Sequence, residues 1–123
     1  MTYQSIFRDH LFQNQVVVVT GGGSGIGRCT AHELAALGAR VALVGRQPDK
    51  LQRVAQEITS AGGVSSTHVC DIREEAQVIQ TVEQVLQAHG RIDGLVNNAG
   101  GQFRSEEHTS ELQSHSFISY AVF

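Results

Sequence analysis

The stretch Thr20-Gly21-Gly22-Gly23-Ser24-Gly25-Ile26-Gly27 lies between an apolar run, residues 16–19, and a segment with helical periodicity. Glycine permits positive φ and carries no Cβ atom, so the backbone of such a turn can approach an anion closely. The free N–H groups and the dipole at the start of a helix favour a phosphate at the same place. The order strand, glycine loop, helix therefore predicts a dinucleotide-binding site, and an ordinary glycine-rich turn is the alternative.

Apolar segments recur along the chain at the spacing of one βα unit. Residues 16–19 and 41–44 are unbroken and rich in valine, which is typical of strands buried on both faces of a parallel sheet. Weaker segments end at Val69-Cys70 and include Leu95-Val96. Because crossovers between parallel strands are right-handed, this pattern predicts an α/β protein. We expect the first βαβαβαβ half only of a Rossmann-type doubly wound parallel sheet, with a ligand crevice at the carboxyl ends of its strands.

Three helices are expected between these strands. The first carries a face of small residues, Gly27, Ala31 and Ala35, and ends at Gly38. The second has Pro48 in its first turn, stops at Gly62 and has an apolar stripe of Leu51, Val54, Ala55 and Ile58. The third is opened by Asp71 and Glu74 in the manner of a capping box, is closed by Gly90 and has a stripe of Val78, Ile79, Val82, Val85 and Leu86.

The composition sets limits on the class of protein. A length of 123 residues fits one domain. The net charge of -3 and the pI near 6.0 do not favour binding to nucleic acid or to an anionic membrane. No apolar run is long enough to span a membrane, and no leader is recognisable, so a cytoplasmic protein is expected. Cys29 and Cys70 form no C-x-x-C pair and are interpreted as packing residues, and the six histidines show no metal-ligand spacing.

Two motifs together resemble the paired signature of the short-chain dehydrogenase/reductase family. They are Thr20-Gly21-x-x-x-Gly25-x-Gly27 and Asn97-Asn98-Ala99-Gly100, the second closing the fourth predicted strand. The resemblance covers about residues 11–103. It implies an oxidoreductase that moves a hydride between a nicotinamide dinucleotide and a small-molecule carbonyl, alcohol or enoyl-CoA substrate, and a homo-oligomer in the full-length form. For Asn97-Asn98 alone, a surface turn is the alternative.

The cofactor-binding positions follow from these motifs. In the glycine loop they are Gly21, Ser24, Gly25, Ile26 and Gly27. The family resemblance assigns Asn98, Ala99 and Gly100 to the nicotinamide-ribose side of the crevice, and Asp71 and Ile72 to the flanks of the adenine. A helix N-cap is an equally good interpretation of Asp71, and the two roles are compatible.

The choice of cofactor depends on the end of the second strand. NAD-binding folds usually place an acid there for the ribose 2′-hydroxyl, whereas this chain has Gly45 and then Arg46. The guanidinium of Arg46 suits a 2′-phosphate, so NADP(H) is predicted; a solvated arginine before a helix is the alternative. NADP-using relatives often have a second basic residue in the loop, where this chain has Ser24, and Arg28 lies beyond the loop.

The sequence does not supply the family's catalytic residues. The family uses a tyrosine with a lysine four residues later, together with a serine and an asparagine, all well beyond Gly100. Tyr120 follows the cofactor motifs too soon, and no catalytic residue is assigned. Gly100-Gly101-Gln102-Phe103 is similar to the branch that contains trans-2-enoyl-CoA reductases and terpenoid alcohol dehydrogenases.

The composition changes at Arg104, after which no apolar face of either period is sustained. Residues 104–123 resemble the conceptual translation of a DNA-sequencing library adapter, with a genuine polar tail as the alternative. We therefore expect a lead-in at 1–14, an NADP(H)-binding Rossmann half-domain at 15–103 and a non-native or disordered tail at 104–123. The chain is interpreted as a truncated, inactive cofactor-binding portion of an NADP(H)-dependent oxidoreductase; the alternative is a non-enzymatic NADP(H)-binding module.

Overall fold

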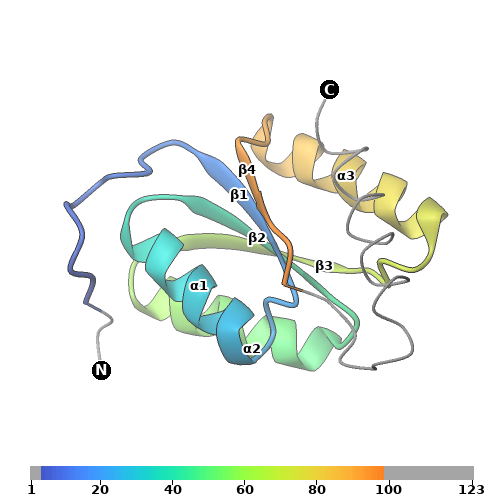
Figure 1. The fold of residues 1–123 in the computed structure, drawn as a ribbon, viewed down its shortest axis with the longest axis horizontal. Helices are drawn as coiled ribbons and strands as arrows, with labels where there is room; N and C mark the ends of the chain where they lie inside the picture. Colours follow the sequence, from blue (N-terminus) through green and yellow to red (C-terminus); the bar gives the residue numbers. More distant parts are fainter. Residues whose placement is uncertain (1–3, 99–123) are drawn as a thin grey trace.

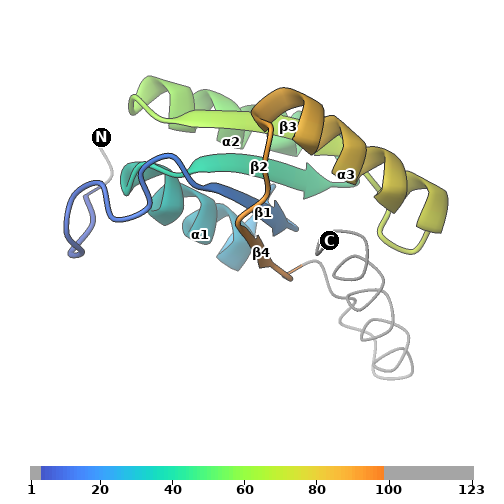
Figure 2. The ribbon, with the colours of Figure 1, turned by 90° about the horizontal axis from the view of Figure 1, so that it is seen from above.

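The computed structural model describes residues 4–98, which form a four-stranded parallel sheet and three helices. The elements in chain order are β1 (Val16–Thr20), α1 (Gly25–Ala36), β2 (Arg40–Gly45), α2 (Pro48–Ser60), β3 (Val64–Val69), α3 (Glu75–His89) and β4 (Gly94–Val96). The strands lie in the order β3-β2-β1-β4. Helices α1 and α2 cover one face of the sheet and α3 covers the other (Figures 1 and 2). The predicted half of a Rossmann-type sheet is confirmed.

The valine-rich strands β1 and β2 are buried because helices cover both of their faces. Alternate side chains of β1 point to opposite faces. Val16 and Val18 pack in a cluster with residues of α3, whereas Val17 and Val19 pack with residues of α1 and α2. Since neither face meets water, an apolar residue is favoured at every position, which explains the unbroken run.

Two hydrogen bonds join Asp93, the residue before the short strand β4, to the start of β1. Leu95 pairs with Val18 in parallel register. Just before β4, the N–H of Asp93 donates to the carbonyl of Val16 over 2.8 Å, and a carboxylate oxygen of Asp93 accepts the N–H of Val16 at 2.7 Å. Asp93 therefore satisfies both backbone groups of the first residue of β1.

Helices α1 and α2 have the predicted ends and faces. Gly27 and Ala31 are buried on α1, and Gly38 follows its end with a φ of 94°. Pro48 begins α2, and its stripe residues Leu51, Val54 and Ile58 are buried. The interpretation of Cys29 as a packing residue is wrong, because Cys29 is exposed, whereas Cys70 is buried.

The predicted capping box of α3 is wrong. The helix begins at Glu75, and the side chain of its N-cap residue, Glu74, makes no capping hydrogen bond. The carboxylate of Asp71 instead accepts the backbone N–H and the guanidinium of Arg73, so it is not directed at the first turn of the helix. The predicted stripe is also too wide, because Ile79 is 37% exposed while Val78 is fully buried. Gly90 ends the helix in the left-handed conformation as expected.

Candidate cofactor site

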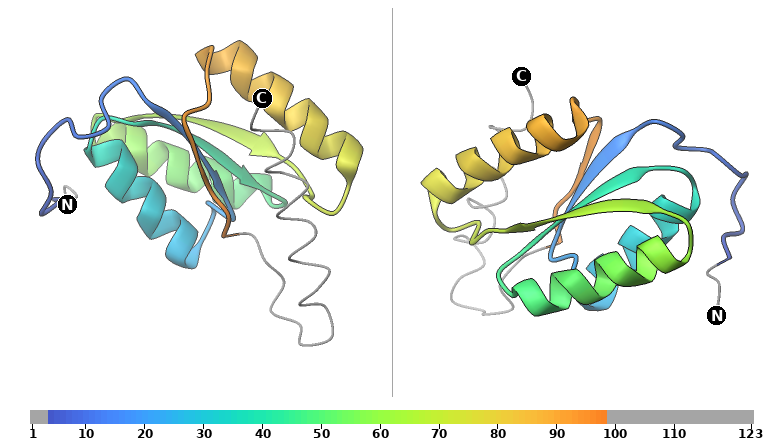
Figure 3. Two further views of the ribbon diagram at one scale, coloured as in Figure 1. Left: turned by 45° about the horizontal axis from the view of Figure 1, so that its top comes forward. Right: turned by 180° about the vertical axis from the view of Figure 1, so that it is seen from behind.

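The glycine loop between β1 and α1 lies at the carboxyl edge of the sheet (Figure 3). Gly21 and Gly25 have φ values of 68° and 58°, a region that other residues adopt only with strain. The N–H groups of Gly21 and Gly22 donate to the carbonyl of Val44, at 2.8 and 3.3 Å, so the loop is fixed to the end of β2. Apart from its chain neighbours and its own helix backbone, no atom of residues 4–98 would lie within 4 Å of a Cβ atom on Gly25, so space remains there among the described residues.

Gly27, in the first turn of α1, lies very close to both the glycine loop and the segment after β4. A Cβ atom at this position would lie 2.1 Å from the carbonyl oxygen of Gly21 and 2.8 Å from the side-chain nitrogen of Asn98. Only glycine permits this approach. The loop, the start of α1 and the segment after β4 thus meet at one point, which places the predicted residues Gly21, Gly27 and Asn98 together.

A threonine hydroxyl holds Asn98 in place. Thr20 is buried at the end of β1, and its Oγ1 accepts the backbone N–H of Asn98 at 2.9 Å and donates to the carbonyl of Val96 at 3.2 Å. This positioning role was missed from the sequence. The signal for it was a polar residue that ends an otherwise apolar strand.

The remaining loop positions lie on the outside of the turn. Ser24 is exposed at the N-cap of α1 and makes no capping hydrogen bond with its side chain, and Ile26 is 75% exposed. Both are therefore accessible to a ligand in the loop. The predicted positions Ala99 and Gly100 lie outside the described residues.

Arg46 and Asp71 follow β2 and β3 at the same edge of the sheet. Hydrogen bonds from Arg73 hold the pKa of the Asp71 carboxyl below its ordinary value, and the charge of Arg46 lowers it further. Arg46 is exposed, and its guanidinium has no hydrogen bond or ion pair with any of residues 4–98. The side chain of Ile72 belongs to the core under α3, and the residue as a whole is only 9% exposed.

Arg28 points away from this edge into a cluster between α1 and α2. Its guanidinium binds Glu57 through two nitrogens, and His32 contacts the same carboxylate at 2.9 Å. These partners, Arg28 above all, lower the pKa of Glu57. Because Arg28 is engaged by Glu57, it does not replace the basic residue that the glycine loop lacks.

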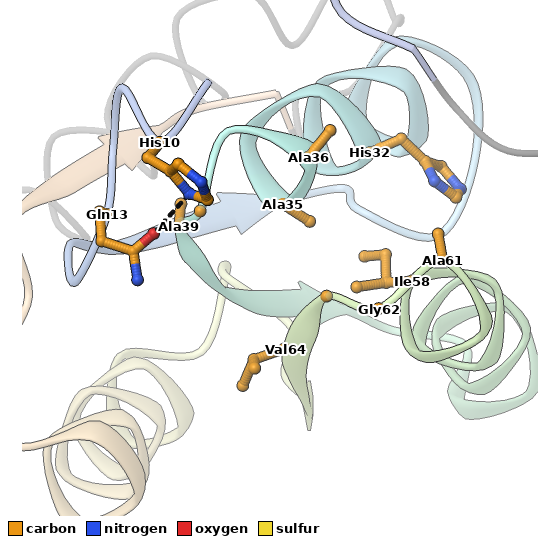
Figure 4. Close-up of a pocket in the computed structure, with 12 residues that line it drawn as sticks. His10, Gln13, His32, Ala35, Ala36, Ala39, Ile58, Ala61, Gly62 and Val64 are labelled. Atoms are coloured by element: carbon orange, nitrogen blue, oxygen red, sulfur yellow. Dashed lines mark hydrogen bonds between the residues drawn. The ribbon is translucent and has the colours of Figure 1, made fainter. Parts of the chain in front are cut away.

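A pocket of about 330 Å³ lies at the opposite, amino edge of the sheet (Figure 4). His10, Gln13 and His32 supply its polar side chains, and Ala39 and Val64, beside the starts of β2 and β3, line it as well. None of the predicted site residues lines this pocket. Within residues 4–98, no three His, Cys, Asp or Glu side chains are grouped as metal ligands would be, and no helix is long and apolar enough to cross a membrane.

The family model of the short chain dehydrogenases matches residues 15–121 of the chain. The chain belongs to this family. Its parallel four-stranded sheet with three helices is thus the first part of a short-chain dehydrogenase fold. The oxidoreductase family predicted from the two motifs is confirmed, and it implies a nicotinamide cofactor.

Among solved structures, this chain is similar to a citronellol catabolism dehydrogenase of Pseudomonas aeruginosa PAO1. The two are 48% identical with a TM-score of 0.87, over 97% of this chain and 54% of the other. A metagenomic short-chain oxidoreductase solved in complex with NADP is 43% identical with a TM-score of 0.71, over 88% of this chain and 50% of the other.

Among curated relatives, a probable 2,4-dienoyl-CoA reductase of Caenorhabditis elegans is 40% identical over 100 residues, which are 80% of this chain and 32% of that protein. This chain thus spans about half the length of these two solved relatives and about a third of the length of this curated relative.

Proposed function

We propose that this chain is the NADP(H)-binding portion of a short-chain oxidoreductase. In this proposal the loop positions hold the pyrophosphate, Asp71 and Ile72 flank the adenine, and the segment after β4 faces the nicotinamide ribose. The loop positions are Gly21, Ser24, Gly25, Ile26 and Gly27; the segment after β4 supplies Asn98, Ala99 and Gly100. The close approach at Gly27 supports the assignment, because it leaves backbone rather than side chains facing the crevice. When bound, the nicotinamide would give or accept the hydride.

The observation that carries the choice of NADP(H) over NAD(H) is Arg46. It follows β2 directly, position 45 is glycine rather than an acid, and the guanidinium has no ion-pair partner among residues 4–98. A planar guanidinium suits a phosphate, whereas a ribose 2′-hydroxyl calls for an acceptor. The metagenomic relative solved with NADP supports the same choice.

The test is nucleotide binding by the wild type and Arg46→Ala, measured by titration with NADPH and NADH. We expect the variant to raise the Kd for NADPH about tenfold, because a charge-assisted contact to phosphate is lost, and to leave the Kd for NADH within about twofold. A wild-type chain that binds NADH as tightly as NADPH would contradict the proposed cofactor.

For the full-length form we propose hydride transfer to or from a small-molecule carbonyl, alcohol or enoyl-CoA. The citronellol catabolism dehydrogenase and the 2,4-dienoyl-CoA reductase support these substrate classes. Lys50 is the one lysine of the sequence, and Arg46 stands four residues before it, so the family's tyrosine–lysine pair is not in these 123 residues. We therefore infer that these 123 residues bind cofactor without turnover. No observation favours a non-enzymatic module, and a cytoplasmic location, a homo-oligomer and a non-native tail stay predictions.

A further inference from the structure

The first turn of α2 fits between the glycine loop and the end of β2. A Cβ atom placed on Gly23 would lie 3.0 Å from the Cβ of Lys50, and one placed on Gly45 would lie 3.3 Å from the side chain of Leu51. The stem of Lys50 therefore starts directly beside the glycine loop. The same turn of helix lies against the residue that precedes Arg46.

The basic side chains at or near this edge divide into those with an ion-pair partner and those without one. Arg28 is engaged by Glu57, and Arg73 is engaged by Asp71. Lys50 and Arg46 are both exposed, and neither forms a hydrogen bond or an ion pair within the described part of the chain. Two unpaired cations thus remain, one from the end of β2 and one from the first turn of α2.

The end of β2 is where a Rossmann-type fold places the 2′ position of the adenosine ribose. In NADP(H) this position carries a phosphate with nearly two negative charges, whereas in NAD(H) it carries a neutral hydroxyl. A lysine ammonium is a compact charge on a flexible four-carbon stem, so from its position beside Gly23 it can reach an anion between the loop and Arg46. At the 2′ position of NAD(H) it has no charge to meet, and only this position differs between the two nucleotides.

We propose that Lys50 binds the 2′-phosphate of NADP(H) together with Arg46 and is a second determinant of cofactor specificity. This inference rests on the proposed NADP(H) function. It gives the chain the second basic group that Ser24 does not supply in the loop. The contact comes from the start of α2, whereas the second basic residue of NADP-using relatives often lies in the glycine loop.

The binding test compares Lys50→Gln with Arg53→Gln in the full chain. Both residues are exposed on α2 one turn apart, both lack ion pairs within residues 4–98, and both changes remove one positive charge. We expect Lys50→Gln to raise the Kd for NADPH about fivefold and to leave the Kd for NADH within about twofold. Arg53→Gln should leave both constants within about twofold, and Lys50→Arg should restore NADPH binding. Equal effects of Lys50→Gln and Arg53→Gln would overturn the inference.

A second test needs no substitution, because Lys50 is the one lysine of the sequence. Acylation of its amine is followed by the mass of the peptide that contains it, with and without saturating nucleotide. NADPH should slow the labelling about tenfold, and NADH should leave the rate within about twofold. Selective NADPH binding with unprotected Lys50 overturns the role of Lys50 alone. Failure of the wild type to bind NADPH overturns both this role and the proposed function.

Discussion

The two edges of the sheet differ in whether the polar groups described below have partners within the fold. At the amino edge, Asp93 binds both backbone groups of Val16, and the N–H of Arg40 donates to the carbonyl of Gln15 at 2.8 Å. At the carboxyl edge, Arg46 and Lys50 have no ion pair within residues 4–98. Because an unpaired group can still bind a ligand, the carboxyl edge keeps two cations available for chemistry, whereas Asp93 and Arg40 at the amino edge are used within the fold.

The largest effect on stability and nucleotide binding is expected from Gly27→Ala, which adds a methyl group where α1 approaches the glycine loop at the carboxyl edge. The added methyl group would lie 2.1 Å from the carbonyl of Gly21, so the loop or the start of α1 must move. We expect a loss of about 3 kcal/mol in the free energy of unfolding and loss of nucleotide binding. Urea denaturation and an NADPH titration measure the two effects.

The matched change is Gly25→Ala, because within residues 4–98 no other side chain would crowd the added methyl group, while the φ of 58° is unfavourable for alanine. It should cost about 1 kcal/mol, since only the backbone conformation opposes it. If Gly27→Ala cost no more stability than Gly25→Ala, the close approach of Gly27 to the Gly21 carbonyl would not be what requires glycine at this position.

At the amino edge, Asp93→Ala should reduce stability without touching the cofactor site. The change removes the acceptor of the Val16 N–H, and we expect a loss of about 1–2 kcal/mol with unchanged nucleotide affinity. Hydrogen bonds from Arg91, and then from Val16, hold the pKa of Asp93 below its ordinary value. Its contribution is therefore complete above the unfolded pKa, about 3.9, and is lost as the pH falls through the lower folded value.

Thermal unfolding from pH 7 down to pH 3 checks this prediction. The variant should lose less stability than the wild type across the acid range. A weaker affinity of Asp93→Ala for NADPH at pH 7 would show that the two edges are coupled rather than independent.

The smallest effect is expected at His89, the last residue of α3, near Arg40 at the amino edge. Burial lowers its pKa, and the charges of His68 and Arg40 lower it further. Its Nε2 lies 2.8 Å from the hydroxyl of Ser66, which also lies 2.8 Å from Nε2 of His68. The unfolded chain therefore takes up the proton first, so stability should decrease as the pH falls below about 6.5.

We expect His89→Gln to reduce the difference in melting temperature between pH 7.5 and pH 5.5. The control is His10→Gln, which removes an exposed histidine from the pocket at the same edge of the sheet. If His89→Gln and the wild type were to lose the same number of degrees, protonation of His89 would have no part in the acid sensitivity.

The fold could be predicted from the sequence where local pattern and burial agree. The valine runs became β1 and β2, and the stripe of α2 with Pro48 at its start became a helix with the expected bounds. The start of α3 could not be predicted, because two local interactions competed for one carboxylate. Asp71 could cap the helix or bind Arg73, and the ion pair with Arg73 prevailed.

The candidate site was predictable in its backbone and less so in its side chains. The loop glycines were identified because the close approach at Gly27 requires glycine, and Asn98 was identified from the family resemblance. The pairing of Arg28 with Glu57 and the contact of Lys50 with Gly23 depend on how α1 and α2 pack together. Such contacts join residues far apart in the chain, and no local pattern encodes them.

The position of β1 in the middle of the sheet has a consequence for the newly made chain. The Val16 N–H finds its partner in Asp93, 77 residues later, and β4 follows directly. At about 5–20 residues per second, a ribosome needs roughly 4–15 s to synthesise that interval. During this time one edge of a valine strand has no partner, so the nascent polypeptide offers other chains an apolar strand to pair with. Its dependence on chaperones should be greatest just before residue 96 leaves the exit tunnel.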